Sequence, residues 1–117
     1  GDGTQTRDFV YIDDVVEAFL QAGLRPDELL GRPAFVCSGQ GTSVADAFRL
    51  AVETVARRTG RRVDLRTVPA PPGLSPIESR NFVGIPAALA GIGWYPRHDL
   101  AHGLYRTVEA FLVSRDC

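Results

Sequence analysis

The sequence has 117 residues, a formal net charge of −1, 44% hydrophobic residues and 23% charged residues. A chain of this size buries roughly two thirds of the surface that its unfolded form exposes, which is enough for one modest core. The ordinary hydrophobic fraction and the small net charge exclude intrinsic disorder. No apolar run reaches the roughly 18 residues that a membrane span needs, so we expect no membrane segment.

Two residue types are missing from the sequence. It contains no Met and no Lys, and all 13 basic residues are Arg. The lack of an initiator Met indicates a processed product, an excised domain or a segment of something longer. Chemistry that needs a lysine amine, such as a Tyr-Lys catalytic pair, is excluded for this chain. The 14 acidic residues balance the Arg residues, so we expect no nucleic-acid partner.

The two cysteines and the polar start of the chain bear on its compartment. Cys37 lies in an apolar run and Cys117 is the last residue, a placement that makes neither a disulfide framework nor a metal site. Residues 1–7 show no secretory signal. One buried thiol and one terminal thiol predict a reducing cytoplasm.

The first part of the sequence predicts two strands and one helix. Residues 9–12 are aromatic and β-branched, which is typical of a short strand. Asp13 then caps a helix that ends at Gly23, and acidic residues in its first turn complement the helix dipole. Residues 25–33 form a polar loop, and residues 34–37 are predicted to be a short strand buried on both faces.

The helix that follows residue 43 has the clearest signals. Ser43 with Asp46 three residues later resembles a capping box, and Gly60 lies just past the predicted end. Apolar residues recur at helical spacing over this stretch: Val44, Ala47, Phe48, Ala51 and Val55.

The rest of the chain predicts one strand and two helices. Residues 63–66 alternate apolar and charged side chains, which is the pattern of a strand with one wet face. The Pro-rich residues 69–76 form a loop, a short helix covers residues 85–92, and residues 94–96 end it. Asp99 caps a last helix with apolar residues on one face.

Three short strands with helices between them predict an α/β arrangement. Such strands make a poor sheet by themselves, because at least one apolar strand would lie at an open edge. The sequence therefore predicts that a partner sheet is missing from this chain.

Two short motifs imitate cofactor and metal sites. Residues 39–41, Gly-Gln-Gly, stand between a predicted strand and a helix, as in a dinucleotide-binding turn. The third glycine is absent, so an ordinary strand-to-helix turn is favoured. His98 and His102 have the spacing of a zinc-binding helix, but no other His exists to complete the site. We therefore interpret them as surface or capping histidines.

Acidic residues at the start of the first helix have two interpretations. Asp13, Asp14 and Glu17 have the residue types of a metal cluster. Their position in a first helical turn explains them without a metal, and this interpretation is favoured.

Arg7 lies between a glycine-rich turn, residues 1–6, and the first predicted strand. An Arg at a strand entrance, with glycines that let a ligand approach, suits a bidentate hold on phosphate or carboxylate. A structural salt bridge would explain an Arg at this position equally well. The physical argument alone therefore leaves both roles of Arg7 open.

The order of residues resembles one known family over nearly the whole chain. Residues 1–18 resemble a segment of nucleotide-sugar epimerases and dehydratases of the extended short-chain dehydrogenase/reductase family. Residues 35–44 resemble the strand and turn that follow it, and residues 93–96 and 104–111 match later elements in the same order. The resemblance implies that residues 1–117 are the C-terminal substrate-binding lobe, with a few short strands, about four helices and no Rossmann core.

The resemblance also implies a function for this lobe. The complete enzyme would use NAD or NADP and act on a nucleotide-diphospho-sugar, whereas this chain alone would bind no cofactor and carry no catalytic residue or metal. Its substrate-binding candidates are Arg7, Gln5 and Arg80, with Arg7 on the substrate phosphates. Its partners would be the missing N-terminal Rossmann portion and, in the complete enzyme, a second copy as a homodimer.

Two departures from the family pattern concern the phosphate site. Residues 71–74 lack the Arg and the Asp that the family often has after the third strand. Gly84 or Ile85 stands in place of a family Asp, and Ala87 or Ala88 in place of a basic residue. Losing one cation from a diphosphate site costs on the order of 1.5–3 kcal/mol, and Arg80 is the nearest replacement.

Two other functions stay open at this point. The chain is compatible with a free-standing, non-catalytic module that binds a nucleotide sugar or a protein. A metal-dependent hydrolase built on His98 and His102 is the third possibility. Among these, the substrate-holding part of an epimerase or dehydratase is the preferred hypothesis.

Overall fold

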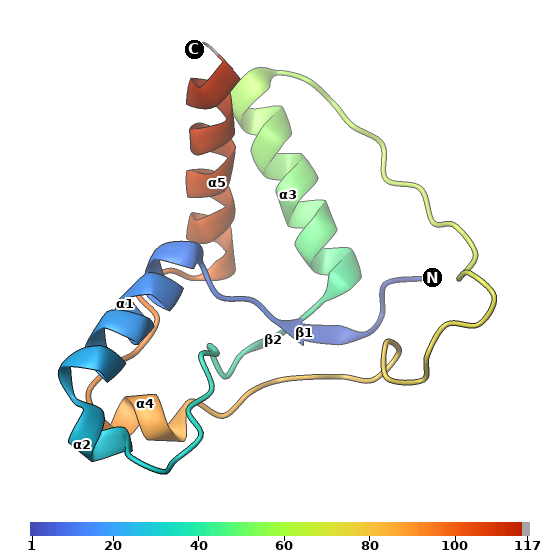
Figure 1. Cartoon of the computed structure of the whole chain (residues 1–117). Coiled ribbons are helices and arrows are strands. Elements are labelled where there is room, and N and C mark those ends of the chain that lie inside the picture. The colour runs from blue at the N-terminus through green and yellow to red at the C-terminus, as the bar shows by residue number, and fades with distance from the viewer. Residues whose placement is uncertain (116–117) are drawn as a thin grey trace.

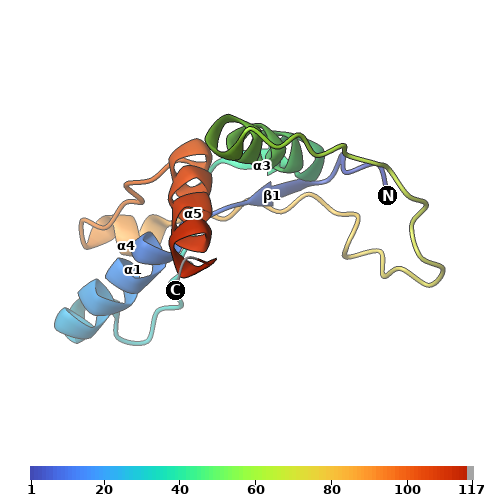
Figure 2. The same ribbon diagram turned by 90° about the horizontal axis from the view of Figure 1, so that it is seen from above.

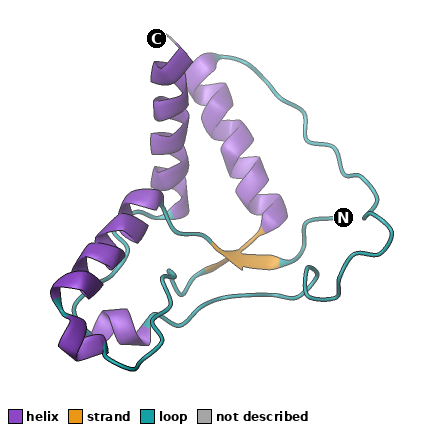
Figure 3. Cartoon of the chain, in the orientation of Figure 1, coloured by secondary structure: helices purple, strands orange, loops and turns teal. Residues whose placement is uncertain are grey.

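The computed structural model describes residues 1–115 as five helices and two short strands (Figures 1 and 3). The molecule is flat and open, with principal extents of 49 × 41 × 21 Å and a radius of gyration of 17.0 Å. A compact domain of this length has a radius of gyration of about 13 Å. Seen from above in Figure 2, a long loop projects well beyond the helices. The predicted α/β fold is confirmed, with five helices in place of about four.

The two strands form a small antiparallel pair at the centre of the molecule. β1 (Thr6–Asp8) pairs with β2 (Gly41–Ser43), with Thr6 opposite Ser43 and Asp8 opposite Gly41. Glycine at position 41 permits this close pairing, because an added Cβ would lie 2.5 Å from Cγ2 of Thr6 and would force that side chain to shift. Residues 39–41 therefore lead into a strand and not directly into a helix.

The first helix begins two residues earlier than predicted and is capped differently. α1 (Ile12–Leu24) carries Asp13 and Asp14 in its first turn, but its N-cap is Tyr11 and not Asp13. The predicted strand over residues 9–12 is wrong, because residues 9–11 only link β1 to the helix.

The predicted polar loop 25–33 contains a short helix. α2 (Pro26–Leu29) begins at Pro26, a position where the missing N–H of proline leaves no hydrogen bond unmade. The loop prediction is therefore wrong over these four residues.

Two more predicted strands are not formed. Residues 34–37 and residues 63–66 are irregular segments without a ladder partner in residues 1–115. A strand needs the N–H and C=O groups of a neighbour, which the residue pattern alone cannot supply. Phe35 is 60% exposed, so the segment around it is not buried on both faces, although Cys37 is buried as predicted. Cys117 lies outside the described residues.

α3 (Val44–Thr59) confirms the predicted caps at both ends. The Ser43 hydroxyl accepts a hydrogen bond from the Asp46 N–H at 3.0 Å and donates one to the Asp46 carboxylate at 2.6 Å. Gly60 ends the helix with a φ of 71°, and its N–H donates to the Ala56 carbonyl. This positive φ is one that only glycine adopts without strain.

The remaining helices also follow their local signals. α4 (Ala87–Gly91) is the predicted short helix, with Pro86 as its N-cap. α5 (Leu100–Arg115) is capped by Asp99, whose carboxylate accepts from the His102 N–H at 2.8 Å. In Figure 1, α3 and α5 lie side by side, and Arg58 of α3 pairs with Glu109 of α5.

The core is small and lies beside α1 and α4. It consists of four buried residues, with Leu29 and Val36 packed against them: Ala18, Leu89, Ile92 and Trp94. In contrast, the apolar stripe of α1 faces solvent, with exposed fractions between 51% and 77%: Ile12, Val16, Phe19, Leu20 and Leu24. Within the described residues, no helix is both long and apolar enough to cross a membrane.

Candidate functional site

Arg7 on β1 is held by backbone carbonyl groups, and it makes no salt bridge with any side chain of residues 1–114. Its Nη1 donates to the Thr6 carbonyl at 3.0 Å and to the Arg80 carbonyl at 2.5 Å, and its Nη2 donates to the Glu78 carbonyl at 2.6 Å. The guanidinium has five N–H donors. Within residues 1–115 the Nε–H and the second N–H of Nη2 make no hydrogen bond, and two adjacent guanidinium N–H groups can bind two oxygens of a phosphate.

The segment that supplies the Glu78 and Arg80 carbonyls lies along β1. Asn81 Oδ1 accepts from the Thr6 N–H at 2.8 Å, and the Phe82 N–H donates to the Thr6 carbonyl at 2.9 Å. We call residues 78–84 the strap. The strap holds the guanidinium of Arg7 in one orientation, because its Glu78 and Arg80 carbonyls accept two of the donors, while Thr6 of β1 accepts a third.

The other two predicted substrate-binding residues are placed differently. Arg80 is joined to Arg7 through its main-chain carbonyl, and its side chain is exposed. Gln5 instead lines a hollow of about 550 Å³ beside Phe48 and Arg66. The structure therefore brings Arg7 and Arg80 together, while Gln5 borders a separate hollow.

Asp8, the neighbour of Arg7, is the most heavily hydrogen-bonded side chain near this site. Oδ1 accepts from the Ser38 N–H at 2.8 Å and the Ser38 hydroxyl at 2.7 Å, and Oδ2 accepts from the N–H groups of Gly39 at 3.0 Å and Gly84 at 3.2 Å. Burial, the largest single effect, raises the pKa of Asp8, but these hydrogen bonds together lower it below 3.8. Asp8 therefore joins three segments as a carboxylate.

A second buried carboxylate, Asp14, links α1 to the start of α5. It is 3% exposed, and its oxygens accept from the His98 N–H and from His98 Nδ1, both at 3.0 Å. The Trp94 Nε1–H donates to the Asp14 carbonyl at 3.2 Å. Burial raises the pKa of Asp14, but the hydrogen bonds, that of the His98 ring first, lower it below 3.8.

Asp14 also lies close to the two histidines of the sequence. Asp14 is a helix-start residue as predicted, with an added role as the partner of His98. The rings of His98 and His102 lie 4.8 Å apart at 41°. Within residues 1–115, no group of three His, Cys, Asp or Glu side chains is arranged to hold a metal ion.

Sequence reasoning missed the roles of Asp8, Asp14 and Asn81. Their partners lie 30 to 84 positions away along the chain. The one local signal for Asp8 was its place beside Arg7 at a strand, and the signal for Asp14 was its first-turn position.

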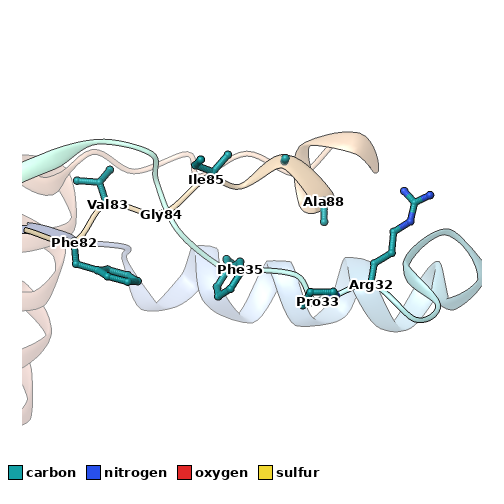
Figure 4. Close-up of a pocket in the computed structure, with 9 residues that line it drawn as sticks. Arg32, Pro33, Phe35, Phe82, Val83, Gly84, Ile85 and Ala88 are labelled. Atoms are coloured by element: carbon teal, nitrogen blue, oxygen red, sulfur yellow. The ribbon is translucent and has the colours of Figure 1, made fainter. Parts of the chain in front are cut away.

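An apolar groove of about 590 Å³ lies between residues 32–35 and the downstream end of the strap (Figure 4). Phe35 borders it on one side and Phe82 and Ile85 on the other, and Arg32 stands at the end near α2. The groove is open, and Phe35, Phe82 and Ile85 are each at least 60% exposed.

The Gly39-Gln40-Gly41 turn does not fit a dinucleotide. A dinucleotide site needs a glycine turn that opens onto a helix N-terminus. Here the turn leads into β2, and a Cβ added at Gly39 would lie 3.6 Å from the Pro86 ring. This turn therefore does not have the geometry of a dinucleotide cradle.

Comparison with known proteins relates the chain to one family. Residues 1–37 match the sequence profile of the NAD dependent epimerase/dehydratase family. A UDP-glucose 4-epimerase of Mycolicibacterium smegmatis is 34% identical over 111 residues, which are 95% of this chain and 33% of that protein. The chain is an NAD-dependent epimerase/dehydratase-like protein. It corresponds to the C-terminal part of extended short-chain dehydrogenase/reductases and spans about a third of the length of the relatives it matches.

Solved structures agree with this epimerase/dehydratase-like identity. A UDP-glucose 4-epimerase of Thermotoga maritima, solved with UDP-glucose, superposes with a TM-score of 0.76 at 29% identity, over 98% of this chain and 34% of that one. The enzyme of Stenotrophomonas maltophila, solved with NAD and formylated UDP-arabinopyranose, gives a TM-score of 0.66 at 29% identity, over 99% and 33%. The C-terminal lobe predicted from the resemblance is confirmed as a fold.

The epimerase/dehydratase-like chain has a structural reason for its glycine at position 84. A Cβ added there would lie 2.5 Å from both Cβ and Sγ of Cys37. Gly84 also gives its N–H to Asp8 at 3.2 Å. Cys37 thus fills the space that a side chain at position 84 would take.

Proposed function

We propose that this chain is the substrate-holding part of an NAD(P)-dependent nucleotide-sugar epimerase or dehydratase, with Arg7 as a ligand of the substrate diphosphate. The observation that carries this proposal is the geometry of Arg7. Three of its donors are held by the carbonyls of Thr6, Glu78 and Arg80. The two remaining donors suit the oxygens of a phosphate.

NAD or NADP belongs, in this proposal, to the complete enzyme. NAD supplies hydride chemistry when it is bound, and no residue here takes part in that step. This chain has no Lys for a Tyr-Lys pair, and its glycine turn at residues 39–41 forms no dinucleotide cradle. Its own residues bind and orient the sugar nucleotide.

The exposed apolar surface favours a chain that is part of a larger enzyme over a free-standing binding module. The stripe of α1, with Val16 and Phe19, and the groove around Phe35 and Phe82 are open to solvent. Exposed apolar patches of this kind mark interaction surfaces. We propose that the nucleotide-binding portion of the enzyme covers them. A homodimer of the complete enzyme and a place in the cytoplasm stay predictions.

Binding of UDP-glucose and dTDP-glucose to the complete enzyme tests this function. We expect one of the two probes to bind, and Arg7→Ala to weaken that binding about 10-fold to 150-fold, because a hydrogen bond to a charged group contributes about 1.5–3 kcal/mol. Arg7→Lys is expected to recover little, because an ammonium group cannot make the bidentate contact. NAD content should not change.

Arg57→Ala is the matched control. Arg57 is an exposed Arg on α3, 3.9 Å from Glu53, and far along the chain from the strap. We expect its variant to bind the sugar nucleotide as the unmodified enzyme does. Unchanged affinity in Arg7→Ala, or no binding of either probe, would contradict the proposed function.

A further inference from the structure

We propose that Asp8 is a positioning residue for Arg7, acting through the strap. This inference rests on the proposed function of Arg7 and adds how its geometry is maintained. Asp8 acts indirectly and does not itself bind the ligand. Each of its two carboxylate oxygens already accepts hydrogen bonds from N–H or O–H donors of the protein.

Each of the three residues of β1 is hydrogen-bonded to the strap. Thr6 binds it at residues 81 and 82, Arg7 binds it at residues 78 and 80, and Asp8 binds it at residue 84. Each contact uses the strap's main chain or the Asn81 side chain. The strap therefore adds an irregular third segment to the β1–β2 pair.

Asp8 holds the downstream end of this segment. Before residue 78 the chain is a long exposed loop, in which residues 61–77 contain no helix or strand. After residue 84 the chain enters α4, where Leu89 is buried in the core. The contact from Asp8 to Gly84 is thus the last hydrogen bond of the strap to β1 before the core, and Cys37 packs against the same residue.

Charge makes this contact a strong one. A carboxylate that accepts from three backbone N–H groups and one hydroxyl makes charge-assisted hydrogen bonds. The same oxygens hold Ser38 and Gly39, so the turn before β2 and the strap are positioned by one side chain. Without the carboxylate, the strap keeps only its contacts to Thr6 and Arg7. The carbonyls of Glu78 and Arg80 are then held less firmly, and Arg7 loses part of its preset orientation.

Asp8→Asn in the complete enzyme tests this proposal. An amide of the same shape keeps one acceptor and turns an NH₂ group toward N–H donors. We expect the dissociation constant for the sugar nucleotide to rise about 10-fold, at the lower end of the range expected for Arg7→Ala, because the guanidinium remains but loses its preset orientation. The NAD content should stay at its original level.

A double-mutant cycle with Arg7→Ala separates positioning from mere stability. If Asp8 acts through Arg7, Asp8→Asn adds no further loss of affinity once Arg7 is Ala. Asp14→Asn is the matched control, because Asp14 is also a buried carboxylate with N–H partners but contacts neither Arg7 nor the strap. We expect it to lower the melting temperature without changing the dissociation constant.

A milder variant covers the case in which Asp8→Asn does not fold. Ser38→Ala removes the hydroxyl donor at 2.7 Å and leaves the three N–H donors, so we expect a smaller rise that also vanishes in the Arg7→Ala background. If Arg7→Ala weakens binding but Asp8→Asn and Ser38→Ala do not, or if their losses add fully to it, Asp8 is not a positioning residue. If Arg7→Ala itself has no effect, the proposed function fails instead.

Discussion

The Asp14 carboxylate accepts two hydrogen bonds from His98, one from the backbone N–H and one from ring Nδ1, each at 3.0 Å. Because Asp14 lies in the first turn of α1 and His98 lies just before α5, this pair joins two helices that are distant in the sequence. The Nδ1 position must carry the proton in the neutral ring, which leaves Nε2 without one. The tautomer of His98 is thus set by Asp14.

We expect Asp14→Asn to lower the unfolding free energy by about 2–3 kcal/mol at neutral pH, because hydrogen bonds to a buried charged group are lost. Urea unfolding of the complete enzyme measures this loss. His98→Ala should cost a similar amount, since it leaves the carboxylate with one partner fewer. His102→Ala is the control, because the exposed His102 ring contacts no carboxylate, and a loss equal to that of His98→Ala would refute the role of the pair.

The pH dependence of stability follows from Asp8 and Asp14. The pKa of each is lower in the folded protein than its usual value of 3.8. Their contribution is therefore fully present above pH 3.8 and is lost as the pH falls through the depressed folded values. Urea unfolding from neutral pH downward should show a fall in unfolding free energy that is smaller in Asp14→Asn. Equal falls in both proteins would contradict this assignment.

The contact between Gly84 and Cys37 predicts a reciprocal effect of substitution. Gly84→Ala should destabilise the fold, because its Cβ would lie 2.5 Å from Cβ and Sγ of Cys37 and overpacking of this kind costs about 1–3 kcal/mol. The double variant Cys37→Gly with Gly84→Ala moves the side chain across the contact, so it should recover part of the loss. A double-mutant cycle by urea unfolding measures the coupling.

Gly23→Ala is the matched control for this substitution. Gly23 lies within α1, and an added Cβ would meet no atom within 4 Å. We expect this variant to gain about 0.5–1 kcal/mol, because alanine favours a helix over glycine. If Gly84→Ala were as well tolerated as Gly23→Ala, the close packing at Cys37 would be refuted.

The cap of α3 offers a local test. Ser43→Ala removes the acceptor of the Asp46 N–H, so we expect a loss of about 0.5–2 kcal/mol. Ser114→Ala, an exposed serine within α5 whose hydroxyl donates to the Phe111 carbonyl, should change stability far less. The unfolding midpoints of the two variants measure this difference in stability. Equal losses in Ser43→Ala and Ser114→Ala would argue against a stabilising cap at Ser43.

Local signals predicted α1, α3, α4 and α5, but not the short α2. The caps at Ser43, Gly60 and Asp99 are each made by residues within four positions, so a sequence pattern contains all the atoms that are involved. The same reasoning failed for the strands at residues 9–12, 34–37 and 63–66. A strand is completed by a distant partner, and its residue pattern is the same whether or not that partner is there.

The candidate site was predicted only in part for the same reason. Arg7 was found from its motif and its neighbouring glycines, but the carbonyls that hold it belong to residues 78 and 80, more than 70 positions away. The roles of Asp8 and Asp14 depend on equally distant N–H donors. Gln5 and Arg80 were proposed from position alone, and only Arg80 lies against Arg7, through its main chain.

The outward-facing stripe of α1 has a thermodynamic consequence. The helix turns Asp14 and Ala18 inward and presents Ile12, Val16 and Phe19 to solvent, the reverse of an ordinary surface helix. Removing one such side chain from water contributes about 1.5–3 kcal/mol, so covering three of them supplies free energy comparable to the whole stability of a small domain. Folding of this chain and occupation of the stripe are therefore linked equilibria, and whatever covers α1 also stabilises the distant hydrogen bonds that hold Arg7.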